Sequence, residues 1–136
     1  MNAPQQDPIQ ESPQLESPHK GKTGLKRVWN ALFYSLEGFG AAWIHEDAFR
    51  QESILALIMI PLALLIGDSG LERAFMIFSL MLVLIVELVN SAIEATVDRI
   101  SLENHKLAKR AKDIGSAAVL ISLINVAVIW GLVLFG

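Results

Sequence analysis

The apolar positions of the chain first follow a helical period and then merge into three long stretches. Between residues 24 and 45, large apolar side chains recur every three or four positions, which predicts one amphipathic helix. Basic residues crowd its start, and Trp29 and Trp43 lie on its apolar stripe. Helices of this composition commonly lie in a membrane interface, so we expect a surface helix; the alternative is a helix facing the core of a soluble bundle.

The three apolar stretches are long enough to cross the roughly 30 Å hydrocarbon layer of a bilayer as helices. The last contains 23 consecutive uncharged residues, Ile114–Gly136. Pro61 interrupts the first, which membrane helices tolerate when neighbouring groups satisfy the freed carbonyl. The predicted fold class is an all-α membrane protein, a helical bundle in which the surface helix precedes three transmembrane helices, at about residues 49–67, 71–97 and 112–135.

The composition supports a membrane protein and excludes several other classes. Of the 136 residues, 53% are hydrophobic and 18% are charged, against about 25% charged residues in ordinary soluble domains. The absence of cysteine excludes a disulfide-bonded fold, cysteine-ligated zinc and thiol catalysis. The chain is too short for a large α/β enzyme, and a net charge of −3 gives no reason to expect a nucleic-acid partner.

The N-terminal segment differs in composition from the rest of the chain. Residues 1–19 contain four of the five prolines, separated by glutamines, and almost no large apolar side chain. Such a segment cannot bury enough surface to offset the entropy of ordering it. We therefore predict a disordered tail at 1–19, followed by a membrane domain at 20–136.

The distribution of basic residues predicts the orientation in the membrane. Five of them precede or begin the first span, five surround the loop between the second and third spans, and one follows the first span. The positive-inside rule then places the N-terminus and the 98–113 loop in the cytoplasm. In chain order, the three groups are Lys20, Lys22, Lys26, Arg27 and Arg50, then Arg99, Lys106, Lys109, Arg110 and Lys112, and finally Arg73 alone.

A polar stripe runs along the cytoplasmic half of the second predicted span. Glu87, Asn90, Ser91, Glu94 and Asp98 fall within about 100° of arc on a helix. Carboxylates within a membrane are costly, which favours a functional role. The alternative is a polar seam that joins helices, but asparagine or serine alone would suffice for that.

Two carboxylates at the boundary between membrane and cytoplasm can take different roles in a reaction between a hydroxyl group and a metal-bound anion. One carboxylate can bind a hard divalent cation, and the other, in a drier place, can accept a proton from a hydroxyl. A second acidic cluster, Glu46 and Asp47 with Glu52, could complete a magnesium site from another helix. Lys112 begins the third span and suits a phosphate, although a snorkelling lysine at the membrane edge has the same pattern.

Three blocks of the chain resemble the small bacterial diacylglycerol kinases. The stretch from Glu87 to Arg99 is similar to the family motif E-x-x-N-[ST]-A-[IV]-E-x-x-x-D, and residues 41–52 and 111–119 are also similar to family blocks. The likeness covers about residues 24–135. It implies ATP-dependent phosphorylation of diacylglycerol to phosphatidic acid, by a homotrimer in the bacterial inner membrane, with active sites between protomers at the cytoplasmic boundary.

The resemblance also implies roles for individual residues. Glu87 matches the catalytic base of the family, and Glu46 and Glu94 match the carboxylates that bind Mg²⁺. The positions that match contacts to ATP are Arg27, Tyr34, Glu46, Glu94, Glu103, Asn104, His105, Lys112 and Asp113. The positions that match contacts to the lipid are Arg27, Ala31, Ser35, Ala41, Trp43, Ile44, Glu52, Glu87, Asn90 and Ser116.

Two other functions remain open from the sequence. Related members phosphorylate a polyprenol such as undecaprenol, and a single sequence does not decide between the two lipid acceptors. A small membrane pore or assembly protein, with the stripe around Glu87 lining a channel, is the non-enzymatic alternative. The pore predicts ion flux without ATP turnover, whereas the kinases predict phosphate transfer to a lipid.

Overall fold

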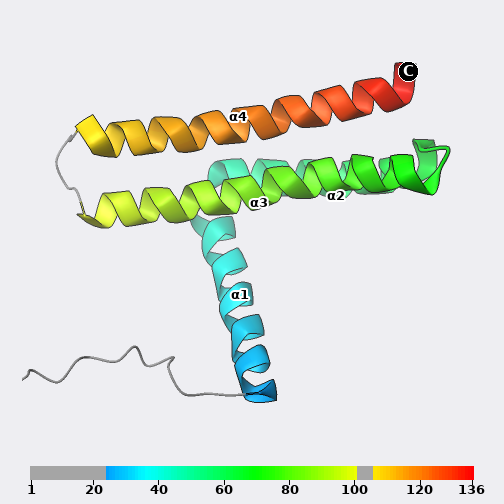
Figure 1. Cartoon of the computed structure of the whole chain (residues 1–136). Helices are drawn as coiled ribbons and strands as arrows, with labels where there is room; N and C mark the ends of the chain where they lie inside the picture. Colours follow the sequence, from blue (N-terminus) through cyan, green and yellow to red (C-terminus); the bar gives the residue numbers. More distant parts are fainter. Residues whose placement is uncertain (1–23, 101–105) are drawn as a thin grey trace, which may run out of the picture. The chain divides into compact units, whose positions relative to one another are not determined.

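Four helices make up the part of the chain that the structure describes. The structure is a computed structural model, and it describes residues 24–100 and 106–136 (Figure 1). The predicted tail at 1–19 lies outside these residues. The chain forms two compact units that meet between Leu36 and Glu37, and each unit is described by itself. The helices are α1 (Leu25–His45), α2 (Asp47–Ile66), α3 (Gly70–Ile100) and α4 (Lys106–Phe135).

The first helix, α1, forms over the residues that the sequence predicts. Nearly all of its side chains are exposed, and only Ala42 is buried. Trp29 and Phe33 contact each other edge to face, with ring centroids 5.5 Å apart. A large ring pair left in solvent favours a location in a membrane interface, which stays a prediction.

The other three helices are long and apolar enough to cross a membrane. At 1.5 Å per residue, the 31 residues of α3 extend over about 46 Å, well beyond the roughly 30 Å of a hydrocarbon layer. Both α3 and α4 continue past the predicted spans into charged residues. Hydropathy marks only the part of a helix that lies in lipid, so these extra turns were not predicted.

The third helix, α3, packs against both α2 and α4, which run antiparallel to it (Figure 1). Small residues allow this close approach, as in other membrane helices. The buried cluster consists of Ala56 and Ala63 from α2, Met76 and Leu80 from α3, and Trp130 from α4. Among the residues that the structure describes, the buried indole N–H of Trp130 has no hydrogen-bond partner.

Two of the buried hydroxyl groups, those of Ser79 and Ser122, are satisfied within their own helix. Ser79 Oγ donates to the Met76 carbonyl at 2.7 Å, and Ser122 Oγ donates to the Val119 carbonyl at 2.7 Å. A serine that bonds to its own preceding turn needs no partner from another helix. These two serines therefore serve as small packing residues at positions where an unpaired hydroxyl would be costly.

The turn between α2 and α3 is fixed by side-chain hydrogen bonds to the backbone. Ser69 Oγ accepts from Glu72 N at 3.2 Å, and Glu72 Oε2 accepts from Asp68 N at 2.8 Å and from Ser69 N at 3.4 Å. This is a capping box, which satisfies the free N–H groups at a helix start. Arg73 Nε donates to the Gly67 carbonyl at 2.8 Å and binds the end of α2 to the start of α3.

Substituting the capping serine is expected to weaken this turn. Ser69→Ala removes the acceptor for Glu72 N, which costs about 1 kcal/mol of unfolding free energy. Unfolding in mixed detergent and SDS micelles measures the change. Glu72→Gln keeps an acceptor oxygen and is expected to cost less than Glu72→Ala. Equal stability of Ser69→Ala and the parent protein would show that the serine bond contributes nothing.

Candidate active site

The polar stripe of α3 is turned towards the neighbouring helices. Glu87 is 4% exposed, and Asn90 and Ser91 are each 9% exposed. Glu94, two turns after Glu87, is half-buried, and Asp98 is exposed. The exposure of the stripe therefore increases towards the C-terminal end of α3. Near Glu87, the polar side chains of the stripe are buried and do not lie on the exposed faces of the helix.

Three further carboxylates gather around Glu87, and two of them come from outside α3. Glu46 and Glu94 lie close enough to interact electrostatically with Glu87, and so does Glu52 of α2. The structure thus brings together residues that are 41 positions apart in the sequence, Glu46 and Glu87. Mutual repulsion makes such a cluster favourable for a cation, a proton, or both.

A cation at this cluster would need ligands beyond the protein. Among residues 24–100 and 106–136, no three acidic or histidine side chains converge closely enough to form a preformed metal cage. Mg²⁺ is usually bound by one or two carboxylates together with waters and substrate phosphates. Glu46 and Glu94 fit this incomplete type of site, because they are two carboxylates that both interact electrostatically with Glu87.

A close approach between α3 and α4 holds Asn90 against Glu94. Asn90 Nδ2 donates to Glu94 Oε1 at 3.1 Å. Gly115 of α4 is buried against the same amide, and a Cβ atom at this position would overlap Asn90 Oδ1. The glycine therefore leaves the room that the Asn90 side chain occupies when it bonds to Glu94.

Several buried polar atoms beside the carboxylates have no partner in the described part of the chain. They are Glu52 Oε2, Asn90 Oδ1 and Ser91 Oγ. An unpaired buried polar atom costs about 1–3 kcal/mol, so such atoms are rare without a reason. Three of them next to one carboxylate cluster favour a place where a polar ligand or water completes the hydrogen bonds.

Ion pairs lie at the C-terminal end of α3 and at the N-terminal end of α4. Lys112 Nζ lies 2.6 Å from Asp98 Oδ1 and also interacts electrostatically with Glu94. Lys109 Nζ lies 2.5 Å from Asp113 Oδ2. The two residues of α4 that were predicted to contact ATP, Lys112 and Asp113, are therefore both engaged with other side chains. Lys112 is the one that links the carboxylate cluster to α4.

The remaining predicted site residues have different placements. Ser116, Ala41, Trp43 and Ile44 are exposed on α4 and on the last turns of α1. Four others belong to the part of α1 that ends at Leu36, which is described by itself: Arg27, Ala31, Tyr34 and Ser35. Ser35 Oγ donates to the Ala31 carbonyl at 2.9 Å. Three further predicted residues lie outside the described residues: Glu103, Asn104 and His105.

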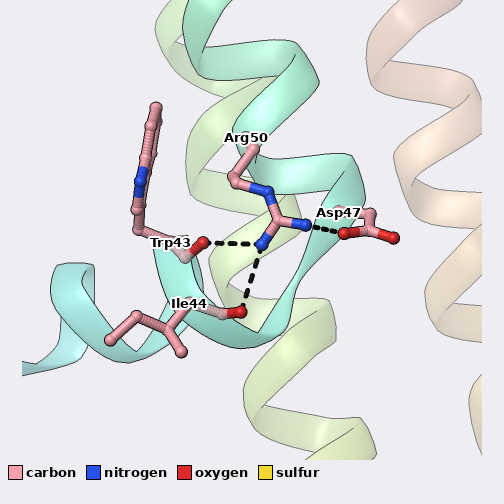
Figure 2. A network of polar contacts seen from close by, with 4 residues as sticks. All are labelled: Trp43, Ile44, Asp47 and Arg50. Carbon is pink, nitrogen blue, oxygen red and sulfur yellow. Dashed lines mark hydrogen bonds and ion pairs between the residues drawn. The ribbon is translucent and has the colours of Figure 1, made fainter.

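Two residues next to the site were not singled out from the sequence. Arg50 counted only as a positive charge and as part of a matching block, but it hydrogen-bonds to two carbonyls at the end of α1 (Figure 2). Gly115 counted only as part of a matching block. A glycine inside an otherwise regular helix was an available signal, because it often marks a close approach of another element.

Comparison with known proteins assigns this arrangement to a family. A family model described as prokaryotic diacylglycerol kinase matches residues 33–134, well over half of the chain. The chain belongs to the prokaryotic diacylglycerol kinase family. The matched range contains the whole carboxylate cluster, and it confirms the resemblance seen in the sequence.

Individual members of the prokaryotic diacylglycerol kinase family are similar over almost their whole length. A diacylglycerol kinase of Pseudomonas aeruginosa is 57% identical over 120 residues, which cover 88% of this chain and 98% of that protein. Those of Haemophilus influenzae and Escherichia coli K12 are each 49% identical over 113 residues, covering 83% of this chain and 96% and 93% of the relatives. This membership makes the protein a lipid kinase and disfavours the pore.

Proposed function

We propose that the protein transfers the γ-phosphoryl group of ATP to the primary hydroxyl of diacylglycerol, giving phosphatidic acid and ADP. One observation carries the proposal most directly. In a chain that belongs to a lipid kinase family, a glutamate buried in a membrane-spanning helix interacts with three further carboxylates. Such a group suits a reaction in which a lipid hydroxyl loses its proton near a metal-bound nucleotide.

The position of Glu87 along α3 agrees with a reaction at the membrane boundary. Counted from Gly70 at 1.5 Å per residue, Glu87 lies about 26 Å along the helix and Glu94 about 36 Å. A hydrocarbon layer of about 30 Å that begins near Gly70 therefore ends between the two glutamates. Glu87 would then meet a lipid hydroxyl, and Glu94 would meet groups that arrive from water.

Glu87 is proposed to act as the general base. Its carboxylate accepts the proton of the diacylglycerol hydroxyl while the hydroxyl oxygen forms a bond to the γ-phosphorus. The bond between that phosphorus and the bridging oxygen to the β-phosphate breaks, and ADP leaves with the electron pair. Repulsion from Glu46, Glu52 and Glu94 favours the uptake of this proton.

Glu46 and Glu94 are proposed to bind Mg²⁺ together with the ATP phosphates. When bound, the ion neutralises charge that develops on the transferred phosphoryl group. The fit rests on the presence of two carboxylates, Glu46 and Glu94, at the cluster. It also rests on the hydrogen bond by which Asn90 orients Glu94 Oε1. Phosphates and water would supply the remaining ligands, as is usual for this ion.

The remaining matched residues divide between the two substrates. For the lipid, the unpaired buried atoms Glu52 Oε2 and Asn90 Oδ1 provide acceptors for a glycerol hydroxyl. For ATP, Lys112 provides a positive charge beside Glu94. The proposed nucleotide contacts also include Arg27, Tyr34, Glu103, Asn104, His105 and Asp113, and the proposed lipid contacts also include Arg27, Ala31, Ser35, Ala41, Trp43, Ile44 and Ser116.

The cellular setting is also part of the proposal. The family resemblance implies the bacterial inner membrane, and the basic residues on one side of the spans favour an N-terminus in the cytoplasm. The homotrimer is inherited from the family resemblance. The helix α1 is proposed to lie on the cytoplasmic surface, where its exposed apolar side chains would enter the interface.

The decisive experiment is a lipid phosphorylation assay on the purified protein in detergent micelles. MgATP and short-chain diacylglycerol are expected to give phosphatidic acid, scored as phosphate in the lipid fraction. Undecaprenol in a parallel reaction is expected to be phosphorylated much more slowly. Faster phosphorylation of undecaprenol would assign the polyprenol as substrate, and no lipid phosphate in either reaction would overturn the kinase proposal.

Substituting the proposed metal ligands is expected to change the magnesium requirement. Glu46→Gln and Glu94→Gln each remove one anionic oxygen ligand, so half-maximal activity should need more Mg²⁺. The measurement is a Mg²⁺ titration at saturating ATP and lipid. An unchanged magnesium requirement in either folded variant would remove that residue from the metal site.

A further inference from the structure

A single residue separates α1 from α2, and that residue is Glu46. The helix α1 ends at His45 and α2 begins at Asp47, with φ −115° and ψ 107° at Glu46 between them. The Glu46 side chain does not cap the helix that follows it. Its direction is therefore not fixed by a local hydrogen bond, although its carboxylate interacts electrostatically with Glu87.

The break deprives the last carbonyl groups of α1 of their helical partners. The final regular bond runs from Glu46 N to the Ala42 carbonyl, at 2.9 Å. The next two carbonyls accept from Arg50 instead, whose Nη1 donates to Trp43 O at 2.8 Å and to Ile44 O at 3.1 Å (Figure 2). One side chain in the first turn of α2 thus binds the end of α1.

The arginine is well suited to this contact. Its positive charge lies at the C-terminus of a helix, where the backbone dipoles favour cations. Nη2 of the same guanidinium forms an ion pair with Asp47 (Figure 2). The Asp47 side chain is 79% exposed, so this pair is screened by solvent and contributes little by itself. The two carbonyl bonds connect the first turn of α2 to the end of α1 across Glu46.

We propose that Arg50 is a positioning residue that fixes the direction of Glu46. By bonding across the break, Arg50 restrains the two backbone torsions of Glu46 and holds its carboxylate at the cluster around Glu87. The expected consequence is tighter binding of the divalent cation and of the triphosphate that shares it. This inference rests on the proposed function, because it requires Glu46 to be a metal ligand.

Another contact spans the same break and should keep variants folded. The rings of Phe39 and Phe49 stack, with centroids 6.5 Å apart, and Phe49 is buried. This apolar contact does not involve the guanidinium. Removing Arg50 is therefore expected to loosen the angle at Glu46 without separating the two helices.

Metal binding without turnover provides the direct test. Mn²⁺ binding to the purified protein, with a non-hydrolysable ATP analogue, is measured by electron paramagnetic resonance. Arg50→Gln should weaken Mn²⁺ binding by about 10–100-fold, the usual effect of losing a residue that orients a metal ligand. Arg50→Lys, which keeps the charge and can still donate to one carbonyl, should recover part of the loss. In activity assays, the change should appear in the KM for MgATP more than in kcat.

Two further variants separate positioning from general destabilisation. Asp47→Asn removes the ion pair but leaves both carbonyl bonds, so its Mn²⁺ affinity should match that of the parent protein. In the double variant of Glu46→Gln and Arg50→Gln, binding should be no weaker than in Glu46→Gln alone, because Arg50 acts through Glu46. Additive losses, or parent-like Mn²⁺ binding in Arg50→Gln, would overturn the inference.

The same experiments distinguish a failed inference from a failed site assignment. If Glu46→Gln binds Mn²⁺ as tightly as the parent protein, Glu46 is not a metal ligand, and both the assignment and the inference fall. If Glu46→Gln weakens binding and Arg50→Gln does not, the proposed metal site stands and only the positioning role is lost. Should Arg50→Gln not fold, Arg50→Lys decides by the same comparison, because it too loses one of the two carbonyl bonds.

Discussion

Replacing Glu87 with glutamine is expected to lower the rate of lipid phosphorylation by about 10²–10⁴-fold, the usual contribution of a positioned proton acceptor. The amide has nearly the same size but cannot take up the proton of the lipid hydroxyl. Because the substitution removes a buried charge that is repelled by Glu46, Glu52 and Glu94, the folded state should be at least as stable. The measurement combines a turnover assay with unfolding in mixed micelles.

A matched control makes the same glutamate-to-glutamine replacement at a position outside the proposed site. Glu37→Gln makes the same replacement at an exposed position of α1 and is expected to leave turnover unchanged. Glu87→Asp keeps the carboxylate but shortens its reach, so it should fall between the two. A folded Glu87→Gln protein with full turnover would exclude Glu87 as the base.

Adding one methyl group at Gly115 is expected to lower activity by about 10–100-fold, the range for losing the residue that orients a metal ligand. The new Cβ would overlap Asn90 Oδ1, so the flexible amide must move and its hydrogen bond to Glu94 is lost. The backbone of α4 need not shift, because the overlap involves only the end of a side chain. A Mg²⁺ titration of Gly115→Ala should show a higher magnesium requirement.

The other glycine within α4 supplies the control for Gly115. A Cβ at Gly131 would meet nothing within 4 Å, so Gly131→Ala should leave activity unchanged. Alanine is favoured over glycine inside a helix by about 1 kcal/mol, and this gain applies to both variants. Equal, parent-like magnesium requirements in the two variants would show that Asn90 does not hold Glu94 for its function.

The helices and the polar stripe were predictable because they depend on local periodicity. Apolar length identified the three spans, and a rotation of 100° per residue correctly placed Glu87 and Asn90 on one face of α3. The helix α4 begins at Lys106, before the span that was predicted from about residue 112. Charged residues can continue a helix outside lipid, so hydropathy does not report where its hydrogen bonds begin.

The contacts between elements were not predictable from one sequence. A basic residue at a membrane edge has the same pattern whether it snorkels or, like Arg50, binds two carbonyls. The partner of Lys112 proved to be Asp98 on the preceding helix, which depends on how α3 and α4 pair. The same pairing of α3 and α4 places Gly115 against Asn90. The lack of room for a Cβ atom at residue 115 therefore arises only in the folded bundle.

The buried indole of Trp130 gives the protein an internal optical reporter. Of the three tryptophans, Trp29 and Trp43 are exposed on α1, whereas Trp130 is enclosed by apolar side chains of the spans. Because apolar side chains surround its ring, the environment has low polarity, and its fluorescence should lie at short wavelength until the helices separate. Phenylalanine at positions 29 and 43 would isolate that signal, so that disassembly of the bundle is followed independently of events at the lipid surface.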